Sequence, residues 1–336
     1  MIVKLGLSAL LVSSALFATS DMRKWIRPNK VPQPKDNKLT KGRVELGKLL
    51  YFDKRLSSSE KVSCATCHSP KRGWTDLVPV SKAMGAGRGP RNSPTVLNTA
   101  YLKRLFWDGR ARSLEQQALG PIEADVEMNM PLEVLIPKLQ KIQGYVKLFK
   151  KAYPNEGGIN SKTLAKAIAS FERTVLSTTA PFDKYAMGDK NAISIKSEKG
   201  YKVFIGKAHC ADCHDKFNFT DGSFHNIGLK DGDLQGKDLG RYNLKRRAAW
   251  YGVFKTPTLR DITKSGPYFH DGSVKTLTEA ATICASGGRY KNGVKNKSTY
   301  IVDRHLTQKE ISQIVAFMKT LTGPDMKLKV PTKFPQ

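Results

Sequence analysis

Two pentapeptides in this sequence combine the residue types that hold a redox-active iron group. Both have the form Cys-x-x-Cys-His, at Cys64-Ala65-Thr66-Cys67-His68 and at Cys210-Ala211-Asp212-Cys213-His214. In this motif two cysteines form thioethers to one porphyrin edge, and the adjacent histidine reaches the iron from the proximal side. We therefore expect two covalent haem c groups, one on Cys64 and Cys67 with His68 as iron ligand, the other on Cys210 and Cys213 with His214 as iron ligand.

Two other uses of paired cysteines explain the motifs less well. A structural zinc ion takes four protein ligands at close spacing, whereas the two motifs lie in opposite halves of the chain. A thioredoxin-like cysteine pair belongs to a βαβ pattern, which surrounds neither motif. The fifth cysteine, Cys284, is left over, and a free thiol in an oxidising compartment needs an explanation.

The N-terminal segment 1–20 has the pattern of an export signal. Lys4 supplies a positive charge, an apolar run follows to Ala18, and Ala18-Thr19-Ser20 has the small-x-small form of a cleavage site. The run is short for a membrane span, and an uncleaved anchor is the alternative. Because bacteria attach haem c outside the cytoplasm, the signal and the motifs together predict a periplasmic protein with no stable membrane insertion after cleavage.

The formal net charge is +28, so the surface is strongly basic. Such a surface favours an acidic protein partner and speeds the encounter with it. Nucleic acid is not expected as a partner, because the basic residues are spread along the chain without a DNA-binding motif. A solvated basic surface with no specific partner is the alternative.

The readable hydrophobic periodicity is helical, and no convincing alternating strand pattern appears. Expected helices run from Leu39 to Phe52, after the cap Ser113, from Pro131 to Tyr153, after the cap Asn160, and after the Thr307–Glu310 capping box. The 336 residues suffice for two domains. We predict an all-α protein of two cytochrome c-like haem domains with long loops, at residues 21–182 and 183–336.

Eight further segments match one known family in order. They read LGKLLYFD at 46–53, GPRNSPT at 89–95, FWDGRA at 106–111, SFERT at 170–174, PFDKY at 181–185, FTDG at 219–222, KTPTLR at 255–260 and PYFHDG at 267–272. With the two haem motifs between them, the mature chain resembles the bacterial di-haem cytochrome c peroxidase and MauG family. The resemblance implies peroxide chemistry at the N-terminal haem and electron entry at the C-terminal haem.

The resemblance also implies roles for single residues. Glu127 matches the acid–base glutamate that moves a proton during peroxide cleavage, and Gln117 matches the nearby amide. Trp107 matches the residue that carries electrons between the haems. Asn92, with the backbone carbonyls of Ser265 and Pro267, matches a calcium site. The alternatives are a solvated surface glutamate, a core tryptophan and a turn asparagine.

Two positions depart from the family pattern. Met84 stands where peroxidases of this family place a histidine that caps the N-terminal haem. Methionine can bind haem iron, and the glycines that follow Met84 can equally leave the iron open. Cys284 stands fourteen residues after His270, where peroxidases have a methionine and MauG-like members a tyrosine.

Cys284 is expected to face inward on a helix. The Thr276–Glu279 capping box starts that helix, and Leu277, Ala280, Ala281 and Cys284 share one of its faces. As an axial iron ligand, a Cys284 thiolate would lower the haem potential relative to methionine. The alternative is a small apolar filler. His209, His225 and His305 are expected to be polar surface or loop residues.

Three functions are compatible with the sequence. The first is a periplasmic di-haem peroxidase that reduces hydrogen peroxide to water with electrons from a small cytochrome or cupredoxin. The second is a MauG-like oxidase that acts on a partner protein, and the third is a non-catalytic electron carrier or redox sensor, closed to peroxide by Met84 and Cys284. A homodimer is compatible with all three.

Overall fold

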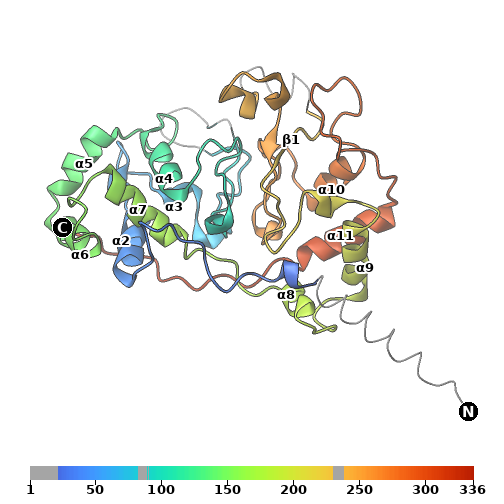
Figure 1. Cartoon of the computed structure of the whole chain (residues 1–336), viewed down its shortest axis with the longest axis horizontal. Coiled ribbons are helices and arrows are strands. Elements are labelled where there is room, and N and C mark those ends of the chain that lie inside the picture. The colour runs from blue at the N-terminus through green and yellow to red at the C-terminus, as the bar shows by residue number, and fades with distance from the viewer. Residues whose placement is uncertain (1–21, 82–88, 90, 230–237) are drawn as a thin grey trace, which may run out of the picture.

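The computed structural model describes residues 22–81, 89, 91–229 and 238–336. The expected export signal and Met84 lie outside the described residues. The described chain forms two largely helical lobes joined by long loops (Figure 1). None of its helices is both long and apolar enough to cross a membrane.

The first lobe contains the helices of the N-terminal half: α2 (Lys41–Phe52), α3 (Cys64–Cys67), α4 (Leu114–Glu123), α5 (Leu132–Gln140), α6 (Gln143–Ala152) and α7 (Ser161–Glu172). The second lobe contains α8 (Pro181–Ala186), α9 (Ile195–Ile205), α10 (Leu277–Ala285) and α11 (Gln308–Lys319). It also has a short antiparallel pair, β1 (Phe224–His225) and β2 (Phe254–Lys255), with Phe224 opposite Lys255. The mostly helical class is confirmed, but this strand pair was not expected.

Side-chain caps start the helices where the sequence predicts. Asn160 caps α7, Thr307 forms a capping box with Glu310 at α11, and the Ser113 hydroxyl accepts from the Gln116 backbone N–H at the start of α4. These bonds satisfy backbone donors that have no partner inside the helix.

The single helix expected from Pro131 to Tyr153 is wrong. The chain turns at Lys141 and Ile142, which separate α5 from α6. Ile142 has extended backbone angles, φ −91° and ψ 100°. The turn lets Leu135 and Leu139 of α5 pack into the same apolar cluster as Tyr145 and Phe149 of α6. Tertiary packing therefore overrides the continuous helical pattern.

A glycine lies at the main helix crossing of each lobe. A Cβ atom on Gly47 of α2 would overlap the carbonyl oxygen of Ala167 in α7. A Cβ atom on Gly200 of α9 would overlap the carbonyl oxygen of Gln313 in α11. Each pair of backbones can approach this closely only because the glycine has no side chain.

We expect Gly47→Ala to lower the free energy of unfolding by about 1–3 kcal/mol, because the added methyl group forces the two helices apart. Gly42→Ala is the matched control, since it lies on the same helix and a Cβ atom added there would meet no atom within 4 Å. That control should gain about 0.5–1 kcal/mol from the better helix former. Denaturant unfolding of both holoproteins measures the difference, and equal midpoints would contradict the close crossing.

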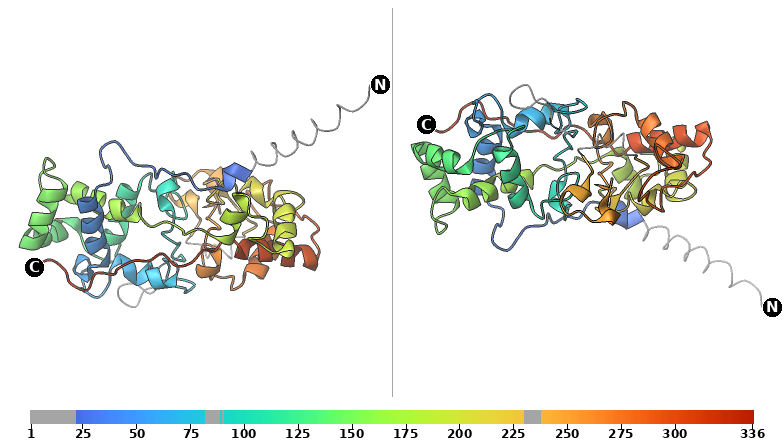
Figure 2. Two further views of the ribbon diagram at one scale, coloured as in Figure 1. Left: turned by 90° about the horizontal axis from the view of Figure 1, so that it is seen from below. Right: turned by 90° about the horizontal axis from the view of Figure 1, so that it is seen from above.

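Segments near both ends of the described chain pack against the lobe formed by the opposite half of the sequence. Trp25 lies in the core of the second lobe, where it stacks on Phe219 at 4.7 Å and donates to the Tyr201 hydroxyl at 2.9 Å. The C-terminal tail returns to the first lobe, where the Gly144 N–H donates to the Gln336 carbonyl at 2.6 Å (Figures 1 and 2). Phe182 also packs in the second core. Trp25 and Phe182, placed in the range 21–182 by the sequence, therefore pack with the C-terminal lobe.

Candidate active site

The first Cys-x-x-Cys-His motif begins α3, and its histidine has the setting of an iron ligand. His68 Nδ1 lies 3.3 Å from the Trp74 carbonyl oxygen, and the Tyr51 hydroxyl donates to the His68 carbonyl at 3.0 Å. A proton on Nδ1 fits this contact and leaves Nε2 as the atom that can bind iron. Burial lowers the pKa of His68, which favours the neutral imidazole that ligation requires.

The second motif repeats this arrangement. His214 Nδ1 lies 2.8 Å from the Phe219 carbonyl oxygen, and burial lowers the pKa of His214. A metal-binding histidine usually donates its other ring N–H to such a carbonyl, which fixes the ring orientation. All five cysteines of the chain are free of disulfides. Both motifs therefore fit covalent haem attachment with a proximal histidine.

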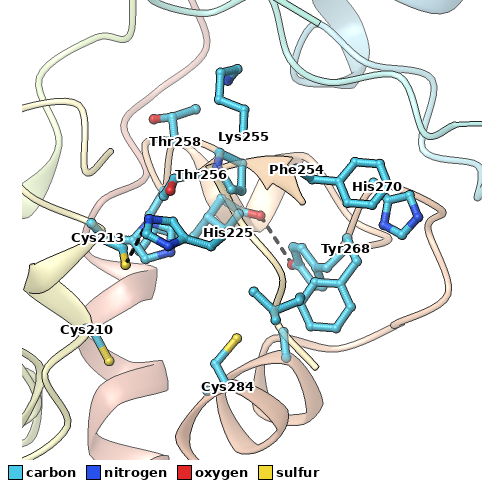
Figure 3. Close-up of a pocket in the computed structure, with 18 of the residues that line it drawn as sticks. Cys210, Cys213, His225, Phe254, Lys255, Thr256, Thr258, Tyr268, His270 and Cys284 are labelled. Carbon is cyan, nitrogen blue, oxygen red and sulfur yellow. Dashed lines mark hydrogen bonds between the residues drawn. The ribbon is translucent and has the colours of Figure 1, made fainter. Parts of the chain in front are cut away.

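A cavity of about 280 Å³ opens beside the second motif (Figure 3). Cys210, Cys213 and His214 line it, and most of the remaining lining side chains are apolar. The face of α10 lines it too, with the residues that the helical spacing predicts to point inward: Leu277, Ala280, Ala281 and Cys284. The cavity has the donor set and the apolar lining that a haem requires.

Cys284 lies close enough to Cys210 and Cys213 for electrostatic effects between their thiols. Burial raises the pKa of the Cys284 thiol to about 11, and the charge of Cys213 adds to this effect. The Cys284 and Cys210 side chains both line the cavity (Figure 3). This thiol is therefore positioned in the chamber that His214 also lines.

Trp107 comes from the first half of the chain but lines the same cavity. Its indole Nε1 donates to the Asn92 carbonyl at 2.9 Å, and its own carbonyl accepts from the Lys255 N–H at 2.7 Å. The adjacent Asp108 pairs with Arg91 at 2.7 Å, and Arg91 reaches Asp238 of the second half at 2.6 Å. These contacts fix the indole at the junction of the two halves.

Glu127 lies in the turn between α4 and α5, where it is partly buried. Burial raises its pKa, although the charge of Arg110 opposes the shift. The charge of Glu127 in turn acts on the thiols of Cys64 and Cys67. Glu127 is therefore close to the first haem motif rather than in bulk solvent. Gln117 lies half-buried on α4, ten residues earlier in the chain.

The Asn92 side chain is buried and oriented by one hydrogen bond. Its amide nitrogen donates to the Val78 carbonyl at 2.9 Å. Asn92, Ser265 and Pro267 all line the cavity. The described residues contain no cluster of three or more acidic, histidine or cysteine side chains that could hold a metal ion. A calcium ion here would depend on neutral oxygen ligands, which bind it weakly.

His225 is not the surface residue that the sequence suggested. It lies on β1, lines the cavity and is partly buried, whereas His209 lies at an exposed part of the cavity lining and His305 is exposed. Its Nδ1 lies 3.0 Å from the Ser298 hydroxyl and its Nε2 lies 3.7 Å from Cys213 Sγ. The Asp221 carboxylate, with Oδ2 3.7 Å from Nε2, raises the pKa of His225 to about 9. No local motif marks this residue, because β1 was not expected.

Glu172 is a second buried carboxyl near the first motif that sequence reasoning missed. Its Oε2 is buried without a hydrogen-bond partner in the described protein, and burial raises its pKa to about 8. Its charge acts on Tyr51 and Cys64. Its place in the SFERT segment was the available signal. The raised pKa favours the protonated, neutral form of this carboxyl.

Comparisons with known proteins cover nearly the whole described chain. Residues 41–191 match the family model described as di-haem cytochrome c peroxidase, and residues 197–322 match the cytochrome c model. The chain is 41% identical to the methylamine utilization protein MauG of Methylorubrum extorquens, over 91% of this chain and 85% of that protein. It is 35% identical to the cytochrome c551 peroxidase of Nitrosomonas europaea, over 98% of this chain and 93% of that protein.

Solved structures share the fold. A crystal structure of a MauG-like protein associated with microbial copper homeostasis superposes with a TM-score of 0.79 at 30% identity, covering 89% of this chain and 95% of that chain. The di-haem peroxidase BthA of Burkholderia thailandensis superposes with a TM-score of 0.72 at 20% identity, covering 88% and 92%. The BthA match supports the two-lobed architecture alone.

Proposed function

From the premise that this chain belongs to the di-haem cytochrome c peroxidase and MauG family of oxidoreductases, we propose that it reduces hydrogen peroxide in the periplasm. The electrons come from a small redox protein with an acidic surface, which suits the net charge of +28. Family membership implies two covalent haem c groups. The observation that carries the proposal is the position of Trp107, which belongs to the first half but lines the cavity of Cys210, Cys213 and His214.

The reaction adds two electrons and two protons to hydrogen peroxide and releases two water molecules. A haem held by Cys64, Cys67 and His68 would supply the redox-active iron that peroxide reduction requires. Glu127 accepts a proton from one peroxide oxygen and returns it to the other, and the Gln117 amide orients the bound peroxide. The raised pKa of Glu127 suits a group that must both accept and donate a proton.

The second lobe receives and relays the electrons. Cys210, Cys213 and His214 would hold the haem of this lobe, Cys284 would be a further ligand to its iron, and Trp107 would connect this site with the peroxide site. Asn92, with the Ser265 and Pro267 carbonyls, would hold a calcium ion at the junction of the lobes.

A MauG-like oxidase acting on a partner protein is the second candidate. Identity to MauG of Methylorubrum extorquens reaches 41%, above the 35% to the Nitrosomonas europaea peroxidase. Position 284 also lacks the methionine that the resemblance leads us to expect in peroxidases. A low-potential thiolate site would disfavour electron entry from a small donor.

Steady-state oxidation of a reduced small cytochrome c by hydrogen peroxide tests the proposal. A peroxidase oxidises two cytochrome molecules per peroxide consumed and continues until one reagent is exhausted. If the protein reacts with peroxide but does not go on to oxidise the donor cytochrome, the MauG-like oxidase is favoured. Haem spectra that do not respond to peroxide would overturn both and leave an electron carrier or sensor.

We expect Trp107→Phe to slow electron transfer between the two haem sites by about 10-fold or more while peroxide binding is unchanged. Phenylalanine keeps an aromatic ring but loses the indole and its hydrogen bond to the Asn92 carbonyl. Trp250→Phe is the control, because this indole stacks with Arg241 and Arg247 outside the described cavity lining. Flash photolysis or stopped-flow spectroscopy separates the two steps, and equal transfer rates in both variants would remove Trp107 from the path.

A further inference from the structure

Lys255 is a buried cation in the wall of the second-lobe cavity. It lies on β2, its side chain lines the cavity, and the residue is 9% exposed. Its backbone N–H donates to the Trp107 carbonyl at 2.7 Å, so its position is fixed relative to the indole. Neither the peroxide chemistry nor the iron ligands described above use its ammonium group.

This ammonium group lacks an anionic partner within the described protein. The negative charge of Asp221 acts on the Lys255 pKa by Coulomb attraction alone. No carboxylate among the described residues forms an ion pair with the ammonium group. Burial lowers the pKa of Lys255 to about 8. A buried charge of this kind is costly unless an opposite charge reaches it. We therefore expect a ligand in this cavity to place a negatively charged group next to Lys255.

The orientation of a covalent haem identifies that group. Haem c has its thioether bonds at one edge and two propionate carboxylates at the opposite edge. Arg304 also lines the cavity, and it lies near the thioether edge because its charge acts on Cys210. Burial raises the pKa of Cys210 to about 12, and the positive charge of Arg304 opposes this rise. In Figure 3 the Lys255 side chain points away from Cys210 and Cys284. Lys255 therefore lies where the propionate edge of the haem is expected.

We propose that Lys255 binds a propionate carboxylate of the haem attached at Cys210 and Cys213. The inference rests on that haem but not on peroxide turnover. The ion pair neutralises one propionate and favours the reduced iron, so it raises the haem potential and offsets part of the effect of a Cys284 thiolate. Because the Lys255 backbone also holds Trp107, one residue links the haem edge to the indole.

Redox titration of the holoproteins tests this without peroxide. Lys255→Leu should lower the potential of the second-lobe haem, whereas Lys255→Arg should leave it nearly unchanged. Lys196→Leu is the control, since it removes the same charge from an exposed position on α9. Redox-difference infrared spectra with haem carrying ¹³C-labelled propionates should show a shift of the labelled carboxylate bands in Lys255→Leu only.

The outcomes separate the ion pair from a general loss of structure. A Lys255→Leu variant that fails to retain haem, beside a Lys255→Arg variant that loads normally, supports a required positive charge at this edge. The proposal would be overturned if Lys255→Leu and Lys196→Leu had the same second-lobe haem potential and the same labelled carboxylate bands. Failure of peroxide turnover in the wild-type protein would reject the proposed function and leave this result unaffected.

Discussion

Glu127→Gln is expected to reduce kcat for peroxide reduction by about 10²–10⁴-fold, the usual contribution of a positioned acid–base group. Glutamine keeps the size and polarity of the side chain but cannot accept and return a proton. Peroxide binding should change little, so KM should stay within a few-fold of the wild-type value. Steady-state kinetics with a reduced cytochrome measures both constants.

The pH dependence of the rate gives a second readout for Glu127. Burial raises its pKa above the ordinary glutamate value of 4.5. Because the first step requires the deprotonated carboxylate, kcat/KM should rise with pH through this raised pKa. Glu127→Gln should abolish that acidic limb.

Glu123→Gln is the matched control, because Glu123 is an exposed residue at the end of α4. It should retain the wild-type rate and the wild-type pH profile. An unchanged rate in Glu127→Gln would show that this carboxyl takes no part in proton transfer. The buried carboxyl of Glu172 would then be the next residue to replace.

Cys284→Met is expected to raise the potential of the second-lobe haem by roughly a few hundred millivolts, within the ~0.8 V that axial ligands span. A thiolate donates electron density and stabilises ferric iron, whereas a thioether favours the ferrous state. The cavity accommodates the change, since methionine is flexible and apolar. Spectroelectrochemistry measures the potential, and the thiolate features of the ferric spectrum should disappear.

Cys284→Ala provides the complementary control for iron ligation. It removes the sulfur and leaves the other residues of the α10 face, Leu277, Ala280 and Ala281, in place. The iron should then bind cyanide or imidazole rapidly. If Cys284 is only an apolar filler, the spectrum and potential of Cys284→Ala will equal those of the wild-type protein.

Local signals in the sequence predicted the parts of this structure that depend on neighbouring residues. The caps at Ser113, Asn160 and Thr307 start their helices because each bond lies within one helical turn. The face of α10 that carries Cys284 follows from the same short-range periodicity. The family segments then indicated which distant residues belong near the haem motifs, including Trp107.

Long-range packing accounts for what the sequence did not predict. The break between α5 and α6 places both helices on one apolar cluster, which no local pattern records. Trp25 packs with Phe219 and Tyr201 from the other half of the chain. The cavity positions of His225 and Lys255 depend on the two-residue pairing of β1 with β2, which is too short to show alternation.

The central claim is that the two haem sites act together in reducing one peroxide molecule. The most direct test mixes the fully reduced holoprotein with one equivalent of hydrogen peroxide in a stopped-flow spectrometer, with excess reduced small cytochrome c in a second experiment. Both haems should be oxidised in the first experiment, and the cytochrome should be oxidised rapidly and continuously in the second. Oxidation confined to one haem, with no sustained oxidation of the cytochrome, would contradict it.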